Sequence, residues 1–199
     1  MDAQSTGALA EVTGVILAGG RGSRMGGEDK GLVMLNGQPL YQHVLQRVQP
    51  QVATVCISAN RNQTRYLQSG FPVIADSIPG YAGPLAGMLA ALQSVKTSWA
   101  LFVSCDTPFI PWHLAQQLWQ QRGEASAVWV RNADRDHPTM ALIHRQAIEP
   151  LEAFLQRGDR KLMLFLVGID AKPVIFNDDP QCFANINTPG DLHHYQENN

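Results

Sequence analysis

The chain has 199 residues, of which 45% are hydrophobic, and its net charge at pH 7 is −2. This length and composition predict one globular domain with a substantial core, and the lack of a basic excess argues against a nucleic-acid-binding protein. The longest apolar run, at 162–167, is far shorter than the roughly 18 residues that cross a bilayer, and the start of the chain lacks the pattern of a secretory signal. We therefore expect a cytoplasmic protein with no membrane or nucleic-acid partner, a disordered tail at 1–11 and a single domain at 12–199.

Apolar runs that predict strands alternate along the chain with segments of helical periodicity. Strands are expected at 12–18, 52–58, 72–75, 99–104, 126–130, 139–143, 174–176 and 182–186. Helices are expected at 38–48, 62–69, 84–94, 111–121, 147–156, 160–167 and 188–197, and the polar stretch 131–138 is expected to be a loop. This alternation predicts an α/β protein with a doubly wound, mostly parallel, Rossmann-like sheet. Such sheets bind ligands beyond the carboxyl ends of their strands.

The most informative segment follows the first strand, where an apolar run ends in the glycine-rich sequence GGRGSRMGGEDKG at 19–31. Glycine has no Cβ, so the backbone N–H groups of such a loop can approach and cradle phosphates. Arg21, Arg24 and Lys30 supply positive charge where a triphosphate would lie. The segment therefore indicates an enzyme that handles a nucleoside triphosphate, although a flexible surface turn is the alternative interpretation.

The two commonest phosphate-binding signatures are absent from this loop. A P-loop requires Gly before its lysine and Ser or Thr after it, whereas Lys30 follows Asp29 and precedes Gly31. The dinucleotide fingerprint requires a third glycine where this chain has Met25. Another class of nucleotide site is therefore expected.

Two carboxylates follow predicted strands directly. Asp106 can hold Mg²⁺, which prefers oxygen ligands and bridges phosphates; the alternative is a turn or helix-capping residue. Asp76 can accept hydrogen bonds from a guanine edge or from ribose hydroxyls, or it is an exposed turn residue. Between them, Gly83–Gly87 resembles a helix N-terminus that opens from a glycine turn, which favours anions, and a plain packing turn is the alternative.

Two later polar segments carry further candidates. His137 lies in the predicted loop and can bind a substrate, although a lone loop histidine is often merely solvated. Thr188 and Asp191 match a helix capping box. That assignment leaves Asn185 and Asn187 available for another role.

Several motifs together carry a resemblance to a known family. These are LAGGRGSRMGGEDK at 17–30, GPLAG at 83–87, CDTP at 105–108, DHPT at 136–139 and NINTP at 185–189. The first motif resembles the general nucleotidyltransferase signature, and the set resembles the molybdenum cofactor guanylyltransferase (MobA) family over nearly all of the chain from residue 13. The resemblance implies transfer of GMP from GTP to molybdopterin that carries molybdenum, with Mg²⁺ as cofactor. Molybdenum-insertion proteins and target molybdoenzymes are implied as partners.

The resemblance also implies roles for individual residues. The family commonly has Asn where this chain has Ser58, and Asn60, two residues on, can compensate. Candidate pterin contacts are His137, Asn185 and Asn187, and the candidate catalytic residues are Lys30, Asp106 and Arg24. The candidate nucleotide and metal contacts are Leu17, Ala18, Gly19, Gly20, Lys30, Ser58, Asp76 and Asp106, with Asp106 as the metal ligand.

Two alternatives to this function stay open from the sequence. The glycine-rich loop also permits cytidylyl or sugar-nucleotidyl transfer, against which only the later motifs argue. A module that binds a nucleotide and delivers a cofactor without chemistry is a different class. The presence of both Lys30 and Asp106 argues against it, because pure binding does not need a placed metal.

Overall fold

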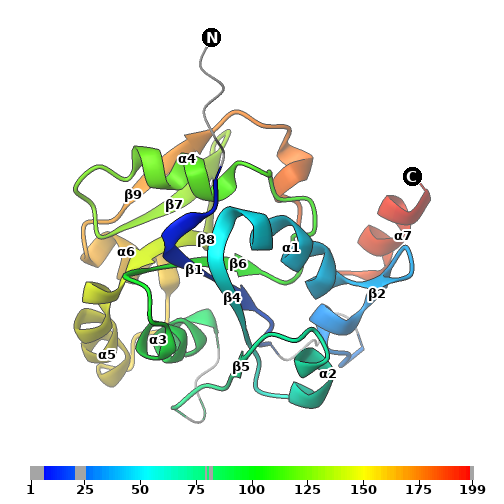
Figure 1. Cartoon of the computed structure of the whole chain (residues 1–199), viewed down its shortest axis with the longest axis horizontal. Helices are drawn as coiled ribbons and strands as arrows, with labels where there is room; N and C mark the ends of the chain where they lie inside the picture. Colours follow the sequence, from blue (N-terminus) through cyan, green and yellow to red (C-terminus); the bar gives the residue numbers. More distant parts are fainter. Residues whose placement is uncertain (1–6, 21–25, 79, 81–82, 198–199) are drawn as a thin grey trace.

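A central sheet of seven strands organises the molecule, in the order β5-β4-β1-β6-β8-β7-β9 (Figure 1). The computed structural model describes residues 7–20, 26–78, 80 and 83–197. Every strand pair of this sheet is parallel except those that β8 makes with β6 and β7. The strands are β1 (Leu9–Leu17), β4 (Val52–Ser58), β5 (Val73–Ile74), β6 (Trp99–Ser104), β7 (Ala127–Asn132), β8 (Arg135–His144) and β9 (Lys172–Phe176). The α/β class and the mostly parallel sheet predicted from the sequence are confirmed.

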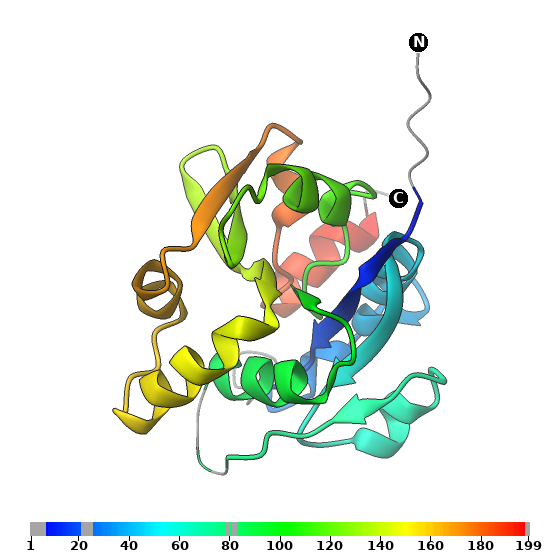
Figure 2. The same ribbon diagram turned by 60° about the vertical axis from the view of Figure 1, so that its left-hand side comes forward.

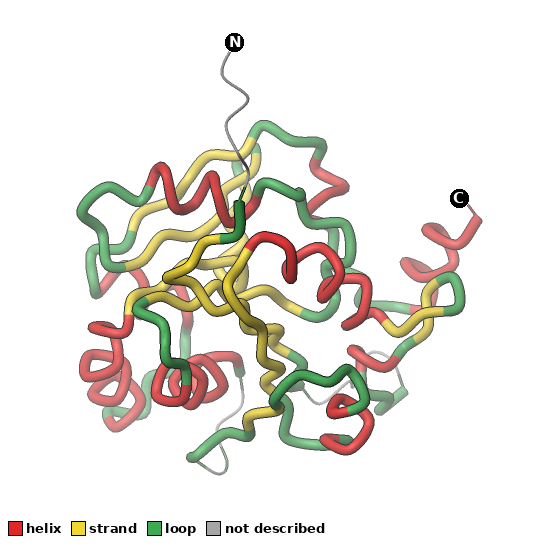
Figure 3. Tube along the Cα trace, in the orientation of Figure 1, coloured by secondary structure: helices red, strands yellow, loops and turns green. Residues whose placement is uncertain are grey.

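Helices cover both faces of this sheet, as Figure 2 and the secondary-structure colouring of Figure 3 show. They are α1 (Leu40–Val48), α2 (Gln63–Leu67), α3 (Pro84–Ser94), α4 (Leu114–Gln121), α5 (Ile148–Gln156), α6 (Leu162–Gly168) and α7 (Pro189–Glu197). Side chains of β1 alternate between the two faces: Ile16 joins the core beneath α1 and α4, whereas Val15 and Leu17 join the core beneath α3, α5 and α6. A small hairpin of β2 (Met34–Leu35) and β3 (Gln38–Pro39) packs with α7 in a third, smaller core.

The element predictions were most accurate for buried strands and for the apolar helix. The predicted segments 52–58, 84–94 and 99–104 coincide with β4, α3 and β6. Strand β1 begins at Leu9 and pairs there with Val52, so the predicted tail at 1–11 was too long; residues 1–6 lie outside the described part. No helix in the described part of the chain has the length and apolar character needed to cross a membrane.

Two predicted segments were wrong. The stretch 131–138 is not a loop, because β7 and β8 extend into it as a hairpin with Asn132 opposite Arg135. The turn contains Ala133 at φ +51°, and the polar side chains that resembled a loop belong to strand residues. The stretch 182–186 is not a strand: a 3-10 helix, η5 (Pro180–Phe183), leads into extended chain. There the Ile186 N–H donates to the carbonyl of Asp106 rather than to a neighbouring strand.

The sheet topology brings three strand ends together. In the parallel register, Leu17 at the end of β1 lies opposite Ser58 of β4 on one side and Ser104 of β6 on the other. The chain runs outward from β1 to β4 and β5 in one direction and to β6 in the other. This is a switch in strand order, the place at which open α/β sheets bind ligands.

Candidate active site

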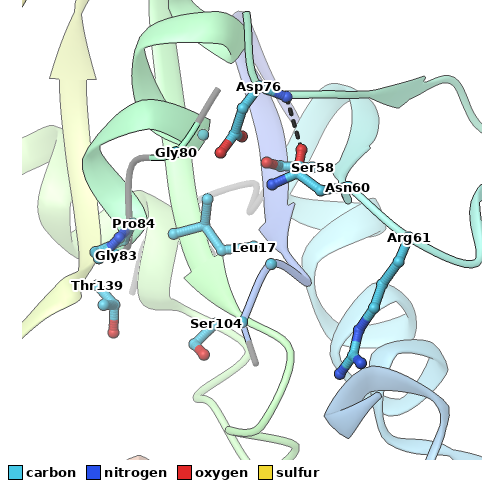
Figure 4. Close-up of a pocket in the computed structure, with 13 residues that line it drawn as sticks. Leu17, Ser58, Asn60, Arg61, Asp76, Gly80, Gly83, Pro84, Ser104 and Thr139 are labelled. Carbon is cyan, nitrogen blue, oxygen red and sulfur yellow. Dashed lines mark hydrogen bonds between the residues drawn. The ribbon is translucent and has the colours of Figure 1, made fainter. Parts of the chain in front are cut away.

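A cavity of about 440 Å³ opens beyond these three strand ends (Figure 4). It is lined by Leu17, Gly19, Gly20, Ser58, Asn60, Arg61, Asp76, Gly80, Gly83, Pro84, Gly87, Ser104 and Thr139. We call it the first cavity. Figure 4 shows Asp76 and Ser58 close together on one side of Leu17, with Ser104 and Thr139 farther along the wall.

The wall between Ser58 and Asp76 is built against a glycine of α3. A Cβ on Gly87 would lie 2.8 Å from the Ser58 Oγ and 3.3 Å from the Asp76 Oδ1, so both polar atoms pack directly on the helix backbone. The Asp76 N–H donates to the Asn60 Oδ1 at 2.8 Å, which ties the segment after β5 to the end of β4. These groups form a narrow polar wall that can bind a base or a ribose.

Helix α3 presents its N-terminus to the same cavity. Its N-cap residue is Gly83, with φ +109°, and Pro84 occupies the first turn, where its missing N–H costs nothing. The first N–H groups of a helix have no partner within the helix and carry partial positive charge. Both Gly83 and Pro84 line the first cavity, so this end of α3 favours an anionic or strongly polar ligand there.

Lys30 lies at the centre of a charged constellation. Its amine donates to the Asn187 Oδ1 at 2.8 Å and lies 3.4 Å from the Asp106 Oδ2. Asp106 is buried and accepts at Oδ1 from the Ser104 hydroxyl at 2.5 Å. Three segments far apart in sequence, the glycine-rich loop, the end of β6 and the chain before α7, therefore meet at one lysine.

A second cavity, of about 760 Å³, lies between the β7–β8 hairpin, the segment from η5 to Asn187 and the start of α7. His137 lines it and stacks on Phe183, with ring centroids 5.3 Å apart. Burial, followed by the nearby charge of Arg135, lowers the pKa of His137, so its imidazole is neutral at pH 7. Asn185 and Asn187 also line this cavity.

Lys30 and Asp106 connect the two cavities without lining either of them. Ser104, which holds Asp106, lines the first cavity, and Asn187, which holds Lys30, lines the second. Thr139 lines both. The arrangement can hold two ligands whose reacting ends meet near the lysine and the carboxylate.

Comparison with known proteins assigns the chain to a family. Residues 14–169 match the model of the MobA-like NTP transferase domain. The molybdenum cofactor guanylyltransferase of Serratia proteamaculans (strain 568) is 50% identical over 187 residues, which cover 94% of this chain and 95% of that protein. That of Yersinia pestis (strain Pestoides F) is 53% identical over 180 residues, 90% of this chain and 92% of that protein. The chain belongs to the MobA-like NTP transferase family.

Solved structures agree with this assignment. The crystal structure of molybdopterin-guanine dinucleotide biosynthesis protein A from Archaeoglobus fulgidus superimposes with a TM-score of 0.78 at 27% identity and covers 93% of this chain and 97% of that one. A CMP:2-keto-3-deoxy-manno-octonic acid synthetase complexed with CTP gives a TM-score of 0.73 at 15% identity, with coverage of 94% and 97%. The second likeness shows the fold alone. The MobA-like fold is thus shared with a synthetase whose structure contains CTP.

Within this MobA-like fold, most of the sequence-predicted residues line one of the two cavities. Leu17, Gly19, Gly20, Ser58 and Asp76 line the first cavity, and His137, Asn185 and Asn187 line the second. Ala18 lines neither cavity. Its N–H donates to the Ser58 carbonyl at 2.8 Å, so that N–H is already engaged within the protein. Arg21 and Arg24 lie outside the described residues.

The structure refines two of the sequence-based interpretations. The capping box is present, because the Thr188 N–H donates to the Asp191 Oδ2 and the Asp191 N–H donates to the Thr188 Oγ1. Asn187, predicted as a pterin contact, binds Lys30 through its side chain. Beside Asp106, burial, followed by the charge of that carboxylate, raises the pKa of the Cys105 thiol well above its ordinary value, so this buried thiol stays protonated.

Two residues that line these cavities make contacts that were not predicted from the sequence. The sequence predicts Ser104 only as the last residue of a strand, whereas in the structure its hydroxyl donates a hydrogen bond to the Asp106 carboxylate. Asp136 accepts from the Trp129 Nε1 at 2.8 Å and the Arg131 Nε at 2.7 Å, and the Arg131 hydrogen bond lowers the pKa of that carboxyl. The signal for Ser104 was its position two residues before Asp106, whereas the Asp136 contacts depend on a hairpin register that the sequence did not predict.

Proposed function

We propose that this chain transfers GMP from GTP to molybdenum–molybdopterin, yielding the guanine dinucleotide form of the cofactor and pyrophosphate. Membership of the MobA-like family and the names of relatives at 50% and 53% identity support this function. Molybdenum-insertion proteins that supply the acceptor and molybdoenzymes that receive the product are the proposed partners.

One observation carries the proposal. The Lys30 amine contacts both the Asp106 carboxylate and the Asn187 amide, at the junction between the two cavities. The first cavity, with Asp76, Ser58 and the N-terminus of α3, suits the nucleoside and its phosphates. The second cavity, with its histidine stacked on Phe183, suits a flat heterocycle. The phosphate chains of the two substrates would then meet at Lys30.

The donor set fits Mg²⁺ shared with a nucleotide. Mg²⁺ is commonly held by one or two carboxylates together with substrate phosphates and waters. The described residues contain no group of three or more His, Cys, Asp or Glu that could enclose a metal by themselves, and Asp106 is a buried carboxylate beside Lys30. Asp106 would hold the ion, which when bound supplies positive charge that neutralises the phosphates.

The reaction forms one P–O bond and breaks another. A terminal phosphate oxygen of the pterin attacks the α-phosphorus of GTP, and the bond between the α-phosphorus and its bridging oxygen breaks, so pyrophosphate leaves with the electron pair. The attacking oxygen is already anionic, so no general base is needed. Catalysis then consists of alignment and charge stabilisation. Lys30 offsets the charge that develops on pyrophosphate, and Asn187 and Asp106 hold its amine in place.

The experiment that tests the proposal supplies the protein with molybdenum–molybdopterin, Mg²⁺ and one nucleotide at a time. With GTP we expect the guanine dinucleotide and pyrophosphate in equal amounts, and with CTP or ATP far less product. Equal or faster transfer from CTP would favour a cytidylyltransferase. Tight binding of GTP and pterin without pyrophosphate release would favour a delivery module.

A further inference from the structure

Asp29, which directly precedes Lys30, is a buried carboxylate at the end of the glycine-rich loop. The residue is only 8% exposed. Its carboxylate accepts three hydrogen bonds. The donors are the Tyr66 hydroxyl at 2.6 Å, the Asn62 Nδ2 at 3.1 Å and the Gly31 N–H at 3.3 Å. Hydrogen bonds of this kind to a charged group are stronger than those between neutral groups.

Tyr66 holds the loop from the side of α2. Its side chain is fully buried and packs edge-on against Tyr41, with ring centroids 4.9 Å apart. A Cβ on Gly31 would collide with the Tyr66 hydroxyl, so the glycine allows the hydroxyl to reach Asp29. Burial and the hydrogen bond to Asp29 raise the pKa of Tyr66 far above its ordinary value, which keeps the hydroxyl protonated as a donor.

The loop needs such an anchor for a physical reason. Gly26 and Gly27 have positive φ values of +69° and +85°, and glycine loses more conformational freedom on ordering than any other residue. Lys30 must nevertheless place its amine within hydrogen-bond distance of Asn187. A backbone fixed on both sides of Lys30, by the Asp29 carboxylate and the bonded Gly31 N–H, reduces the positions that this long side chain can sample.

We propose that Asp29, held by Tyr66 and Asn62, is a positioning residue that fixes the Lys30 backbone so that its amine meets the transferring phosphates, an inference that rests on the proposed function. Asp29 makes its hydrogen bonds away from the substrate and acts through Lys30. The network thereby uses the short helix α2 (Gln63–Leu67) as a support for the catalytic loop.

A double-mutant cycle between Tyr66→Phe and Lys30→Ala tests this inference. The first readout is the Kd of Mg²⁺-pyrophosphate measured by calorimetry, and the second is the kcat and KM of guanylyl transfer. Tyr66→Phe should weaken pyrophosphate binding about 10-fold, since it removes a hydrogen bond to a charged group, and should lower kcat more than it raises the KM for GTP. In the Lys30→Ala background it should have no further effect, because coupled residues are non-additive.

Two matched controls separate positioning from folding. Tyr41→Phe also removes a buried tyrosine hydroxyl from the same aromatic pair and should leave binding and turnover unchanged. Asn62 has φ +53°, so Asn62→Gly keeps its backbone conformation while removing the amide that donates to Asp29. Asn36 also has a positive φ, +50°, but lies in an exposed hairpin turn. Asn36→Gly is therefore the matched control, because it makes the same substitution at a site away from Asp29. Asn62→Gly should weaken pyrophosphate binding, and Asn36→Gly should not.

If Tyr66→Phe weakens binding equally with and without Lys30, or if Lys30→Ala leaves pyrophosphate binding intact, the inference is wrong. Should Tyr66→Phe fail to fold, the same cycle with Asn62→Gly decides. The binding cycle needs no turnover, so failure of guanylyl transfer would reject the proposed function and leave this test standing.

Discussion

Replacing Lys30 with alanine removes a positive charge that contacts both Asp106 and Asn187. A unit charge about 4 Å from a phosphate oxygen contributes roughly 4 kcal/mol at an effective dielectric constant of about 20. Removal of one donor that stabilises transition-state charge costs about 2.7–4 kcal/mol in comparable sites. We therefore expect Lys30→Ala to lower kcat about 100- to 1000-fold.

The same substitution should have little effect on the fold. The Lys30 side chain is 27% exposed and lies 3.4 Å from Asp106, and ion pairs with solvent access contribute about 1 kcal/mol or less to the free energy of unfolding. Asp106 keeps its hydrogen bond from Ser104 in the variant. Activity and stability should therefore separate clearly.

The assay is steady-state pyrophosphate release with GTP, Mg²⁺ and molybdenum–molybdopterin, accompanied by urea unfolding of each variant. Lys96→Ala is the control, because Lys96 is exposed and lies just beyond the C-terminal end of α3, whose N-terminus faces the first cavity. Turnover by Lys30→Ala within about threefold of wild type would refute the role given to Lys30. A loss of activity that matches a loss of folded protein would refute it equally.

Asp106→Asn should abolish Mg²⁺-dependent transfer but leave the fold intact; if the carboxylate served only as a cap or turn residue, asparagine would replace it and activity would survive. Asp76→Ala should narrow the affinity gap between GTP and ATP in calorimetry, whereas an unchanged ratio with weaker binding of both would indicate a ribose contact. Gly87→Ala should destabilise the protein by about 1–3 kcal/mol through overpacking and weaken GTP binding. Adding Ser58→Ala should restore part of the lost stability, because it removes the oxygen 2.8 Å from the new Cβ. The pKa of His137 is lowered in the folded state, so the unfolded chain takes up the proton first as pH falls. The free energy of unfolding should therefore fall as pH drops below about 6.5. His137→Gln should reduce this pH dependence in urea unfolding at several pH values, and an unchanged dependence would contradict the burial of His137.

Much of the fold could be predicted because it depends on local patterns. The strands β4 and β6 are apolar runs buried in the sheet, and α3 has Gly and Pro at its start, so their limits are present in the sequence itself. The extension of β7 and β8 into 131–138 was missed because its residues Arg131 and Asp136 are polar. Their pairing depends on a two-residue turn with Ala133 at positive φ, a conformation that alanine seldom adopts.

The candidate site was predictable where residues follow strands directly. Ser58 ends β4 and Asp106 follows β6, the two strands that flank β1, and the sheet register brings those ends together. Contacts between distant segments were not predictable. Asn187 meets Lys30 across 157 positions of sequence, and Tyr66 reaches Asp29 across 37. Such contacts are set by how α7 and α2 pack, which periodicity and spacing do not specify.

The proposed function requires that the α-phosphorus of GTP moves to the pterin. The most direct measurement follows GTP labelled separately at its α- and γ-phosphorus during a single turnover with Mg²⁺ and molybdenum–molybdopterin. We predict that the α-label appears in the guanine dinucleotide product and that the γ-label appears only in pyrophosphate. Transfer of the α-label should be about 100- to 1000-fold slower in Lys30→Ala and absent in Asp106→Asn. Transfer of the γ-label to the pterin, or release of pyrophosphate with the α-label left in free GMP, would contradict the proposed function.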